Sequence, residues 1–195
     1  MPRKSGKKHS ANQLRIIGGR WRGRKIGFPA TEGLRPTADR IRETLFNWLG
    51  QNLTGVRALD LFAGSGALGF EALSRGAAAV IFVDPTAPVC DSIRTSISTL
   101  IDGEDDKHTV VYQQTAADFL HSAPKHSVDL LFVDPPFAEH MHDEVIRLID
   151  QSNILAPDAM VYVESPIESR FVLPESWQEY RQKTTSSIRY QLIQT

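Results

Sequence analysis

The stretch Asp60-Leu-Phe-Ala-Gly-Ser-Gly-Ala-Leu-Gly69 decides the fold of this 195-residue chain. An apolar run over Ala58–Phe62 leads into a G-x-G-x-x-G motif at residues 64–69, and Ala67–Arg75 then follows a helical pattern. Glycines in such a loop let the backbone approach a ligand closely, and the start of the helix offers free N–H groups. A strand, a glycine loop and a helix in this order predict a nucleotide-binding unit.

Two acids refine the choice of ligand. Asp84 stands 20 residues after Gly64, at the end of the next apolar run, where a carboxylate can accept both hydroxyls of a ribose. NAD and S-adenosylmethionine both contain that ribose. Asp60 lies inside the strand, and a carboxylate there disfavours a pyrophosphate and favours the sulfonium and ammonium of S-adenosylmethionine. The alternative is that Asp60 only caps N–H groups of the loop. The pattern favours S-adenosylmethionine.

A second motif, Asp134-Pro135-Pro136-Phe137, follows the apolar run Leu130–Val133. Open parallel sheets bind ligands at the carboxyl ends of their strands. The two prolines stiffen the turn, so that Asp134 and the Pro135 carbonyl form a rigid pair of acceptors. Such a pair can hold the two N–H bonds of an exocyclic amine and direct its lone pair at a methyl group, while Phe137 stacks on the base. The motif predicts methylation of a base amine, with Asp134 or water taking the released proton; the alternative is a stiff structural turn.

The rest of the chain alternates strands and helices after Val56. Apolar runs between helical patterns indicate a buried, mostly parallel sheet with helices on both faces, and the end of the chain indicates a hairpin with an antiparallel edge. We therefore predict an α/β, Rossmann-like fold. The expected segments are a disordered basic tail (residues 1–13), an N-terminal hairpin and helix (14–52) and a methyltransferase domain (53–195). Further strands are expected at 80–83, 109–112, 128–133, 159–163, 177–183 and 188–193, and helices at 89–101, 116–121 and 139–150. An earlier helix is expected to follow Thr37 and to end at Gly50.

Charge is distributed unevenly. Nine of the 22 Lys and Arg residues fall within the first 30 residues, whereas all 23 acidic residues lie beyond Ala30. A basic N-terminal segment followed by an acidic remainder favours binding of a polyanion at the N-terminal end only. Trp21 lies among basic residues of the expected hairpin, and basic with aromatic residues on an ordered element favour RNA; the alternative is a solvated surface. The residues expected to contact RNA there are Arg15, Arg20, Arg22, Arg24 and Lys25. Thr37 is expected to cap the following helix.

Several functional classes are disfavoured. Cys90 is the only cysteine, which excludes a disulfide framework and a thiolate zinc site, and it is expected to be packed. His140 and His142 are spaced to point apart on a helix, so no metal site is expected. The sequence has neither an apolar run long enough for a bilayer span nor a secretory signal. A monomeric cytoplasmic enzyme is the expectation.

Three stretches together resemble the bacterial small-subunit (16S) rRNA guanine-N2 methyltransferases: residues 60–77, Asp134–Phe137 and the more specific Arg35–Asn47. The resemblance runs from about Leu14 to the C-terminus. It implies a class I methyltransferase sheet of seven strands with the last antiparallel, and a basic extension that grips rRNA. It also implies S-adenosylmethionine as cofactor and, as substrate, a guanine in the small ribosomal subunit or a late precursor.

By position, the resemblance also implies site residues. Relatives often carry an acid where Thr86 stands, and many methyltransferases carry Asp or Asn near the adenine where Thr115 stands. The Thr115 hydroxyl and the Ala116 N–H can still contact adenine. The other expected cofactor contacts are Asp60, Phe62, Gly64, Ser65, Gly66, Gly69 and Asp84, and the signature segment adds Arg35, Thr37 and Asp39 near the cofactor and target pocket.

Other functions stay open at this point. The same chemistry on adenine or cytosine of DNA, on another RNA or on a protein would use the same acceptor pair. An NAD-linked oxidoreductase is disfavoured by Asp60. A binding protein that has lost catalysis is disfavoured by the intact motifs.

Overall fold

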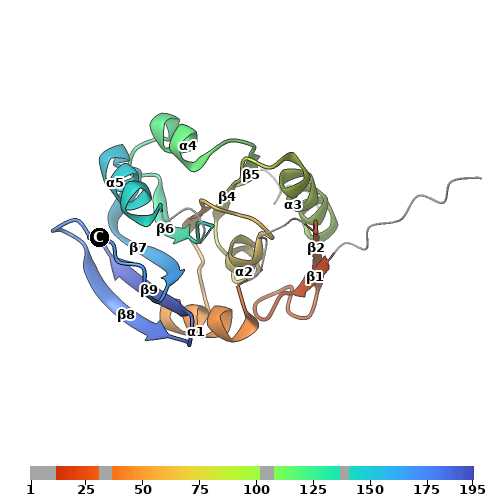
Figure 1. Cartoon of the computed structure of the whole chain (residues 1–195). Helices are drawn as coiled ribbons and strands as arrows, with labels where there is room; N and C mark the ends of the chain where they lie inside the picture. Colours follow the sequence, from red (N-terminus) through yellow and green to blue (C-terminus); the bar gives the residue numbers. More distant parts are fainter. Residues whose placement is uncertain (1–11, 31–36, 102–107, 137–140) are drawn as a thin grey trace, which may run out of the picture.

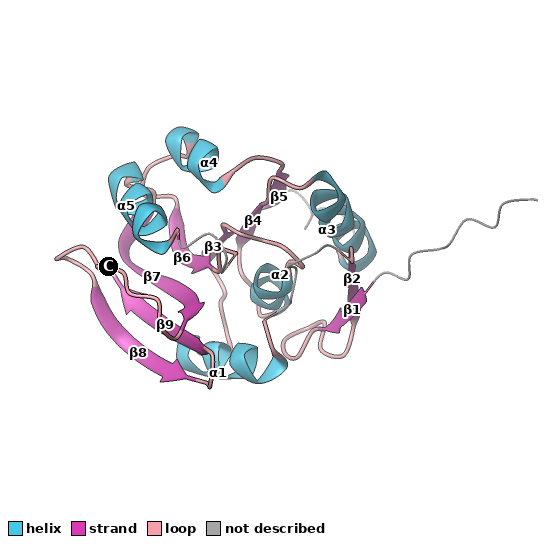
Figure 2. Ribbon diagram, viewed as in Figure 1, coloured by secondary structure: helices cyan, strands magenta, loops and turns pink. Residues whose placement is uncertain are grey.

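The molecule is built on a seven-stranded sheet (Figure 2). The computed structural model describes residues 12–30, 37–101, 108–136 and 141–195. The strand order is β5-β4-β3-β6-β7-β9-β8; the first five of these run parallel, and β9 runs antiparallel to both β7 and β8. The strands are β3 (Arg57–Asp60), β4 (Ala79–Val83), β5 (Thr109–Tyr112), β6 (Val128–Val133), β7 (Leu155–Pro166), β8 (Gln178–Thr184) and β9 (Ile188–Gln194).

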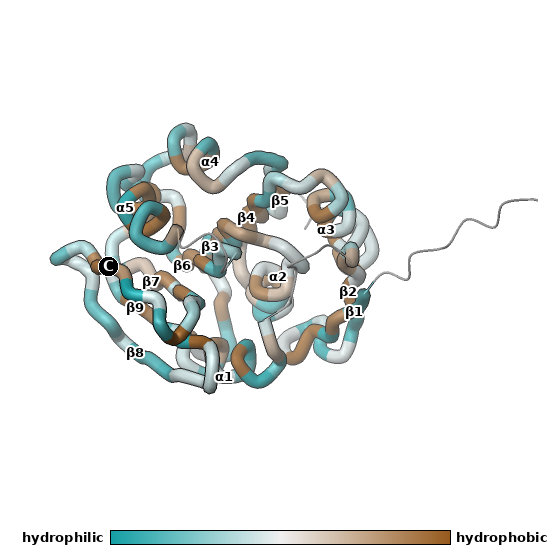
Figure 3. The backbone as a smooth tube through the Cα atoms, in the orientation of Figure 1, coloured by the Kyte–Doolittle hydropathy of each residue, from teal (hydrophilic) through white to brown (hydrophobic). Residues whose placement is uncertain are grey.

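Helices cover both faces of the sheet, as near-continuous apolar strands require. Side chains of α1, α2 and α3 share one buried cluster, and side chains of α4 and α5 belong to a second cluster on the other face. Figure 1 shows α1 below the blue end of the sheet and α5 across from it, and Figure 3 shows hydrophobic segments of β4 and β6 between the helices. The helices are α1 (Asp39–Leu49), α2 (Ala67–Ser74), α3 (Ala87–Leu100), α4 (Ala116–Ser122) and α5 (His142–Ser152).

An N-terminal antiparallel hairpin, β1 (Asn12–Arg15) and β2 (Lys25–Phe28), packs on the side of α2 and α3. Its connection is fixed to the end of α2: the Arg20 N–H donates to the Ser74 carbonyl (2.7 Å) and the Trp21 N–H to the Ser74 hydroxyl (2.9 Å). Apolar side chains of the hairpin lie in the same buried cluster as α1–α3. The hairpin is therefore packed into the core of the sheet domain.

Several expected boundaries differ from the structure. β1 begins at Asn12, inside the segment expected to be a tail. The helix expected at 139–150 begins at His142, and β7 is longer than expected because it pairs with β9 as far as Pro166. Thr37 does not cap α1; the N-cap is Ala38, which makes no capping side-chain hydrogen bond. None of the helices in the described parts of the chain has the length and apolarity needed to cross a membrane.

Candidate active site

Three acidic side chains are brought together at the carboxyl edge of the sheet. The register pairs Asp60 with Phe132, and Phe132 with Tyr162. Side chains two residues apart on a strand share a face, so continuing the register brings Asp134 abreast of Glu164 on that same face. Open parallel sheets bind their ligands at this edge.

The glycine loop has the geometry of a ligand cradle. Gly66 is the N-cap of α2 with φ 74°, a left-handed conformation, and a Cβ there would come within 2.7 Å of the Phe70 ring. A Cβ at Gly69 would collide with the ring of Phe82, so α2 packs closely on β4. The Gly69 N–H donates to Asp60 Oδ2 (3.0 Å), so Asp60 does cap the loop. Of the other expected contacts, Ser65 is buried and Phe62 is half-buried against α4 and α5.

Asp84 is fixed against the same loop. Its Oδ2 accepts from the Gly64 N–H (3.1 Å) and its Oδ1 from the Thr86 N–H (2.8 Å). A carboxylate has about four acceptor sites, so ribose hydroxyls can still bind to it. The Cys90 thiol donates to the Asp84 carbonyl (3.3 Å), and burial raises the pKa of Cys90, as expected for a packed thiol.

The expected adenine contacts lie at the start of α4. Thr115 is the exposed N-cap: its hydroxyl donates to the Asp118 carboxylate (2.7 Å) and accepts from the Asp118 N–H (3.1 Å). The carboxylate of Asp118 is therefore hydrogen-bonded to the capping residue Thr115. Ala116, the first residue of the helix, is buried.

At the Asp-Pro-Pro-Phe motif, Asp134 is half-buried and Pro135 is buried, while Phe137 lies outside the described residues. The Thr37 hydroxyl donates to Asp134 Oδ2 (3.3 Å). Burial raises the pKa of Asp134 well above its ordinary value; the charges of Glu164 and Asp60 add to the rise, and the hydrogen bond from Thr37 opposes it.

The charges at this edge fit a cationic ligand. Burial raises the pKa of Asp60 to about 7, against the lowering effect of the hydrogen bond from Gly69, and burial also raises the pKa of Glu164. Among the described residues, no ion pair involves Asp60, Asp134 or Glu164. Asp60 and Glu164 are buried and Asp134 is half-buried, and carboxylates in such surroundings suit a sulfonium and an ammonium and oppose a pyrophosphate. The site therefore fits S-adenosylmethionine.

The expected RNA-contacting residues of the hairpin are all exposed: Arg15, Arg20, Arg22, Arg24 and Lys25. Arg24 also donates to the Thr99 carbonyl of α3 (2.8 Å), and Arg20 stacks on Trp21 (4.5 Å). Trp21 itself is buried, so the ring packs in the core and is not an open platform for a base. Arg35 lies outside the described residues. Asp39 is exposed on α1, where its Oδ1 pairs with Arg42 (2.6 Å).

Two groups of residues were not foreseen. Arg42, fully buried, pairs with the buried Glu71 of α2 (2.9 Å), and Glu71 also pairs with Arg75 (2.8 Å). Tyr162 donates its hydroxyl to Glu164 (2.9 Å). The sequence signal was weak in both cases. For the first group it was a charged residue inside the apolar stripe of a helix, and for the second it was an acidic residue at the end of an apolar strand.

Of the two histidines for which no metal site was expected, His142 is described and His140 lies outside the described residues. His142 is buried, stacks on Phe171 and has its Nε2 3.0 Å from the Glu164 carbonyl. Within residues 12–30, 37–101, 108–136 and 141–195, no group of three or more His, Cys, Asp or Glu side chains is placed to hold a metal ion.

Comparison with known proteins matches residues 14–194 to the family described as "Conserved hypothetical protein 95". The chain is 42% identical over 189 residues to ribosomal RNA small subunit methyltransferase D of Escherichia coli K12, covering 95% of this chain and 92% of the relative. This chain belongs to that family of small-subunit rRNA methyltransferases. The resemblance inferred from the sequence is thereby confirmed.

Solved structures agree with this membership. A putative methyltransferase of E. coli superposes with a TM-score of 0.81 at 40% identity, covering 94% of this chain and 98% of the other. A putative SAM-dependent methyltransferase from Streptococcus mutans shares the fold at 16% identity, with a TM-score of 0.69 over 94% of this chain and 55% of the other. The predicted α/β, Rossmann-like methyltransferase fold is confirmed.

Proposed function

We propose that this family member transfers the methyl group of S-adenosylmethionine to the exocyclic N2 amine of a guanine in 16S rRNA. One contact carries the proposal: the hydroxyl of Thr37 donates to Asp134. Thr37 belongs to the signature segment that carries the specific resemblance, and Asp134 belongs to the acceptor pair shared by many amino-methyltransferases. The contact joins the two motifs in one site.

The residues of the chain supply binding and alignment, while bound S-adenosylmethionine supplies a methyl group already activated by its sulfonium. With Thr37 on Oδ2, Asp134 keeps Oδ1 for one N–H of the target amine, and the Pro135 carbonyl accepts the other. The two acceptors aim the nitrogen lone pair at the methyl group. The amine becomes acidic once it is alkylated, and the raised pKa of Asp134 makes its ionised carboxylate a stronger acceptor for the proton.

The basic hairpin supports an RNA substrate. Its exposed Arg and Lys side chains lie on an element anchored in the core, so they would present a fixed positive surface to phosphates. The partner we propose is the small ribosomal subunit or its late precursor. We further propose that the protein acts as a monomer in the cytoplasm, and that Thr115 and Ala116 contact the adenine.

The test is transfer of labelled methyl from S-adenosylmethionine to small subunits that lack their native methylations, beside naked rRNA, DNA and a protein mixture. We expect label in the small-subunit RNA, recovered as N2-methylguanosine. Label only in DNA or protein, or on another atom of the RNA, would contradict the proposal.

Variants assign the chemistry to the site. Asp134→Ala is expected to abolish turnover while S-adenosylmethionine affinity changes little. Asp91→Ala is the matched control, because Asp91 is an exposed carboxylate on α3 whose ion pair with Arg94 lies at the surface. Loss of cofactor binding in Asp134→Ala would contradict the role given to Asp134.

A further inference from the structure

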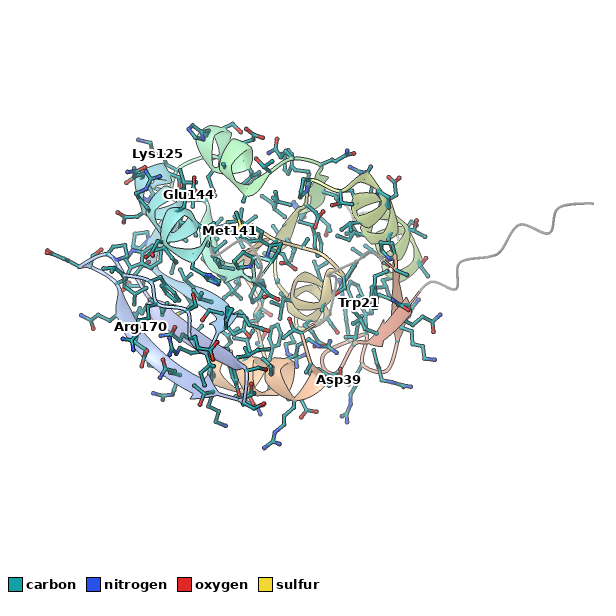
Figure 4. The ribbon with its side chains drawn as sticks, viewed as in Figure 1. Trp21, Asp39, Lys125, Met141, Glu144 and Arg170 are labelled. Carbon is teal, nitrogen blue, oxygen red and sulfur yellow. The ribbon has the colours of Figure 1, made fainter. Side chains whose placement is uncertain are left out.

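Glu164 is a buried carboxylate at the active-site edge that the mechanism above does not use. Only 4% of the residue is exposed, in the last part of β7. The Tyr162 hydroxyl donates to its Oε2 (2.9 Å), and His142 Nε2 contacts its backbone carbonyl (3.0 Å). The side chain is therefore held by Tyr162 of its own strand, and the backbone of Glu164 is contacted from the start of α5. Figure 4 shows Met141, the residue before His142, over the same end of the sheet.

The strand order places Glu164 on the target side of the site. Asp84 follows β4, Asp60 ends β3, Asp134 follows β6 and Glu164 lies on β7, and these four strands are consecutive in the sheet. The cofactor-binding acids thus lie on one side of Asp134 and Glu164 lies on the other. Asp134 holds the amine under the proposed function, so Glu164 faces the ring atoms next to that amine.

Those ring atoms differ between bases. In guanine, two ring nitrogens flank the carbon that bears the 2-amine: N1 carries a hydrogen and donates, and N3 carries a lone pair. In adenine and cytosine, the ring nitrogen beside the exocyclic amine carries a lone pair and accepts. An ionised carboxylate only accepts hydrogen bonds. It can therefore pair with guanine, whereas it would oppose the lone pair of adenine or cytosine.

We propose that Glu164 accepts the N1–H of the target guanine and so selects guanine over adenine and cytosine. This inference rests on the proposed function and names the residue that reads the base. Tyr162 is a positioning residue: its hydroxyl holds Oε2 and leaves Oε1 for the base. Burial makes the selection strong, because a buried acceptor facing a second lone pair loses its hydrogen bond without access to water.

The experiment removes the N1 hydrogen in question. The methylated guanine is first mapped in small subunits treated with the wild-type protein. Subunits are then reconstituted with 16S rRNA ligated from fragments, which carries either guanine or 2-aminopurine at that position. 2-Aminopurine keeps the 2-amine but has a lone pair at N1 and lacks the 6-oxygen, so the change in preference between the wild-type protein and Glu164→Gln isolates the contact to N1. Its fluorescence also reports binding without turnover, and unlabelled guanine subunits serve as competitor.

The wild-type protein is expected to prefer guanine over 2-aminopurine by roughly 10- to 100-fold in affinity and in kcat/KM, the range of a hydrogen bond to a charged group. Glu164→Gln should reduce the preference to within about threefold, because an amide can accept from N1–H or donate to N1. Glu168→Gln, an exposed change just beyond β7, is the control and should keep the wild-type preference.

The outcomes separate this inference from the proposed function. Suppose that the wild-type protein methylates guanine N2, but that Glu164→Gln lowers affinity and kcat/KM equally for both substrates. Glu164 then does not read the base, and the proposed function stands. If the wild-type protein makes no N2-methylguanosine at all, the proposed function itself fails. Tyr162→Phe should weaken the preference for guanine less than Glu164→Gln does. An equal loss of kcat/KM on both substrates in Tyr162→Phe would show that the pair of Tyr162 and Glu164 has only a structural role.

Discussion

Replacing Asp60 by Asn should stabilise the cofactor-free protein above neutral pH and weaken its hold on S-adenosylmethionine. Asp60 is 3% exposed and accepts one hydrogen bond, from Gly69, and its pKa is raised from 3.8 to about 7. A carboxyl whose folded pKa is raised stabilises the protein while both states are protonated, and that stability is lost as pH rises through the folded pKa. The loss thus runs from about pH 4 to about pH 7.

The magnitude follows from the shift. Each pKa unit corresponds to about 1.4 kcal/mol, so a shift of roughly three units amounts to about 4 kcal/mol at most. Asn cannot ionise, and it keeps an oxygen for the Gly69 N–H. The variant should therefore be more stable than the wild-type protein at about pH 8, by up to that amount, and the two should converge toward about pH 4.

Cofactor affinity should respond in the opposite direction. The cations of S-adenosylmethionine favour the ionised form of Asp60, so binding near and below pH 7 requires loss of a proton. Affinity should fall roughly tenfold from about pH 8 to about pH 6. Calorimetric titration across this range, with urea unfolding of the cofactor-free protein, measures both effects, and Asp91→Asn controls for an exposed carboxyl. Equal pH profiles for the wild-type and Asp60→Asn proteins, in affinity and in stability, would refute the reasoning.

Three further predictions concern the surrounding structure. Glu71→Leu should lower the free energy of unfolding by about 3–5 kcal/mol in urea, because it leaves Arg42 and Arg75 buried without their shared partner, whereas Asp91→Ala should cost less than about 1 kcal/mol; similar losses in both would argue against the network. Reversing the charge of Arg20, Arg22 and Arg24 should weaken RNA binding and flatten its salt dependence while thermal unfolding is nearly unchanged, and unaltered binding would show that the hairpin does not grip RNA. Gly66→Ala should lower cofactor affinity at least tenfold, since the Cβ meets Phe70 at a left-handed residue, and unchanged affinity in calorimetry would contradict the role of the loop.

Local sequence signals predicted the sheet and the acids at its edge. The apolar runs predicted strands β3, β4 and β6 closely, because parallel strands buried on both faces must be apolar throughout. The edge strand β5 was predicted from its β-branched and aromatic residues, although Val110 and Tyr112 are exposed. The position of Asp84 and Asp134 at strand ends sufficed to place them at one edge, because every parallel strand ends on the same side. Glu164 obeys the same rule, but the strand was expected to end at Val163, so its acid was not counted with the others.

Contacts between segments far apart in the chain could not be read from local signals. Thr37 has the residue type and position of a helix cap, and only the approach of α1 to β6 gives its hydroxyl a different partner in Asp134. Trp21 lies among arginines as an RNA-stacking residue would, but the fixed connection to Ser74 turns it into the core. In both cases a local preference worth about 1 kcal/mol yields to tertiary packing.

A buried ion network connects the basic hairpin to the helix that follows the glycine loop. Glu71 lies in α2, directly after the glycine loop, and it accepts from the Ile17 N–H of the hairpin (2.6 Å) as well as from Arg42 and Arg75. Arg42 also donates to the Arg15 carbonyl (3.0 Å). One carboxylate thus joins the hairpin, α1 and α2. Because removing a partner from such a network leaves a buried charge, the hairpin cannot shift without cost relative to the glycine loop. The surface proposed to bind RNA and the loop proposed to bind the cofactor are held at a fixed distance, as in-line transfer to one chosen base requires.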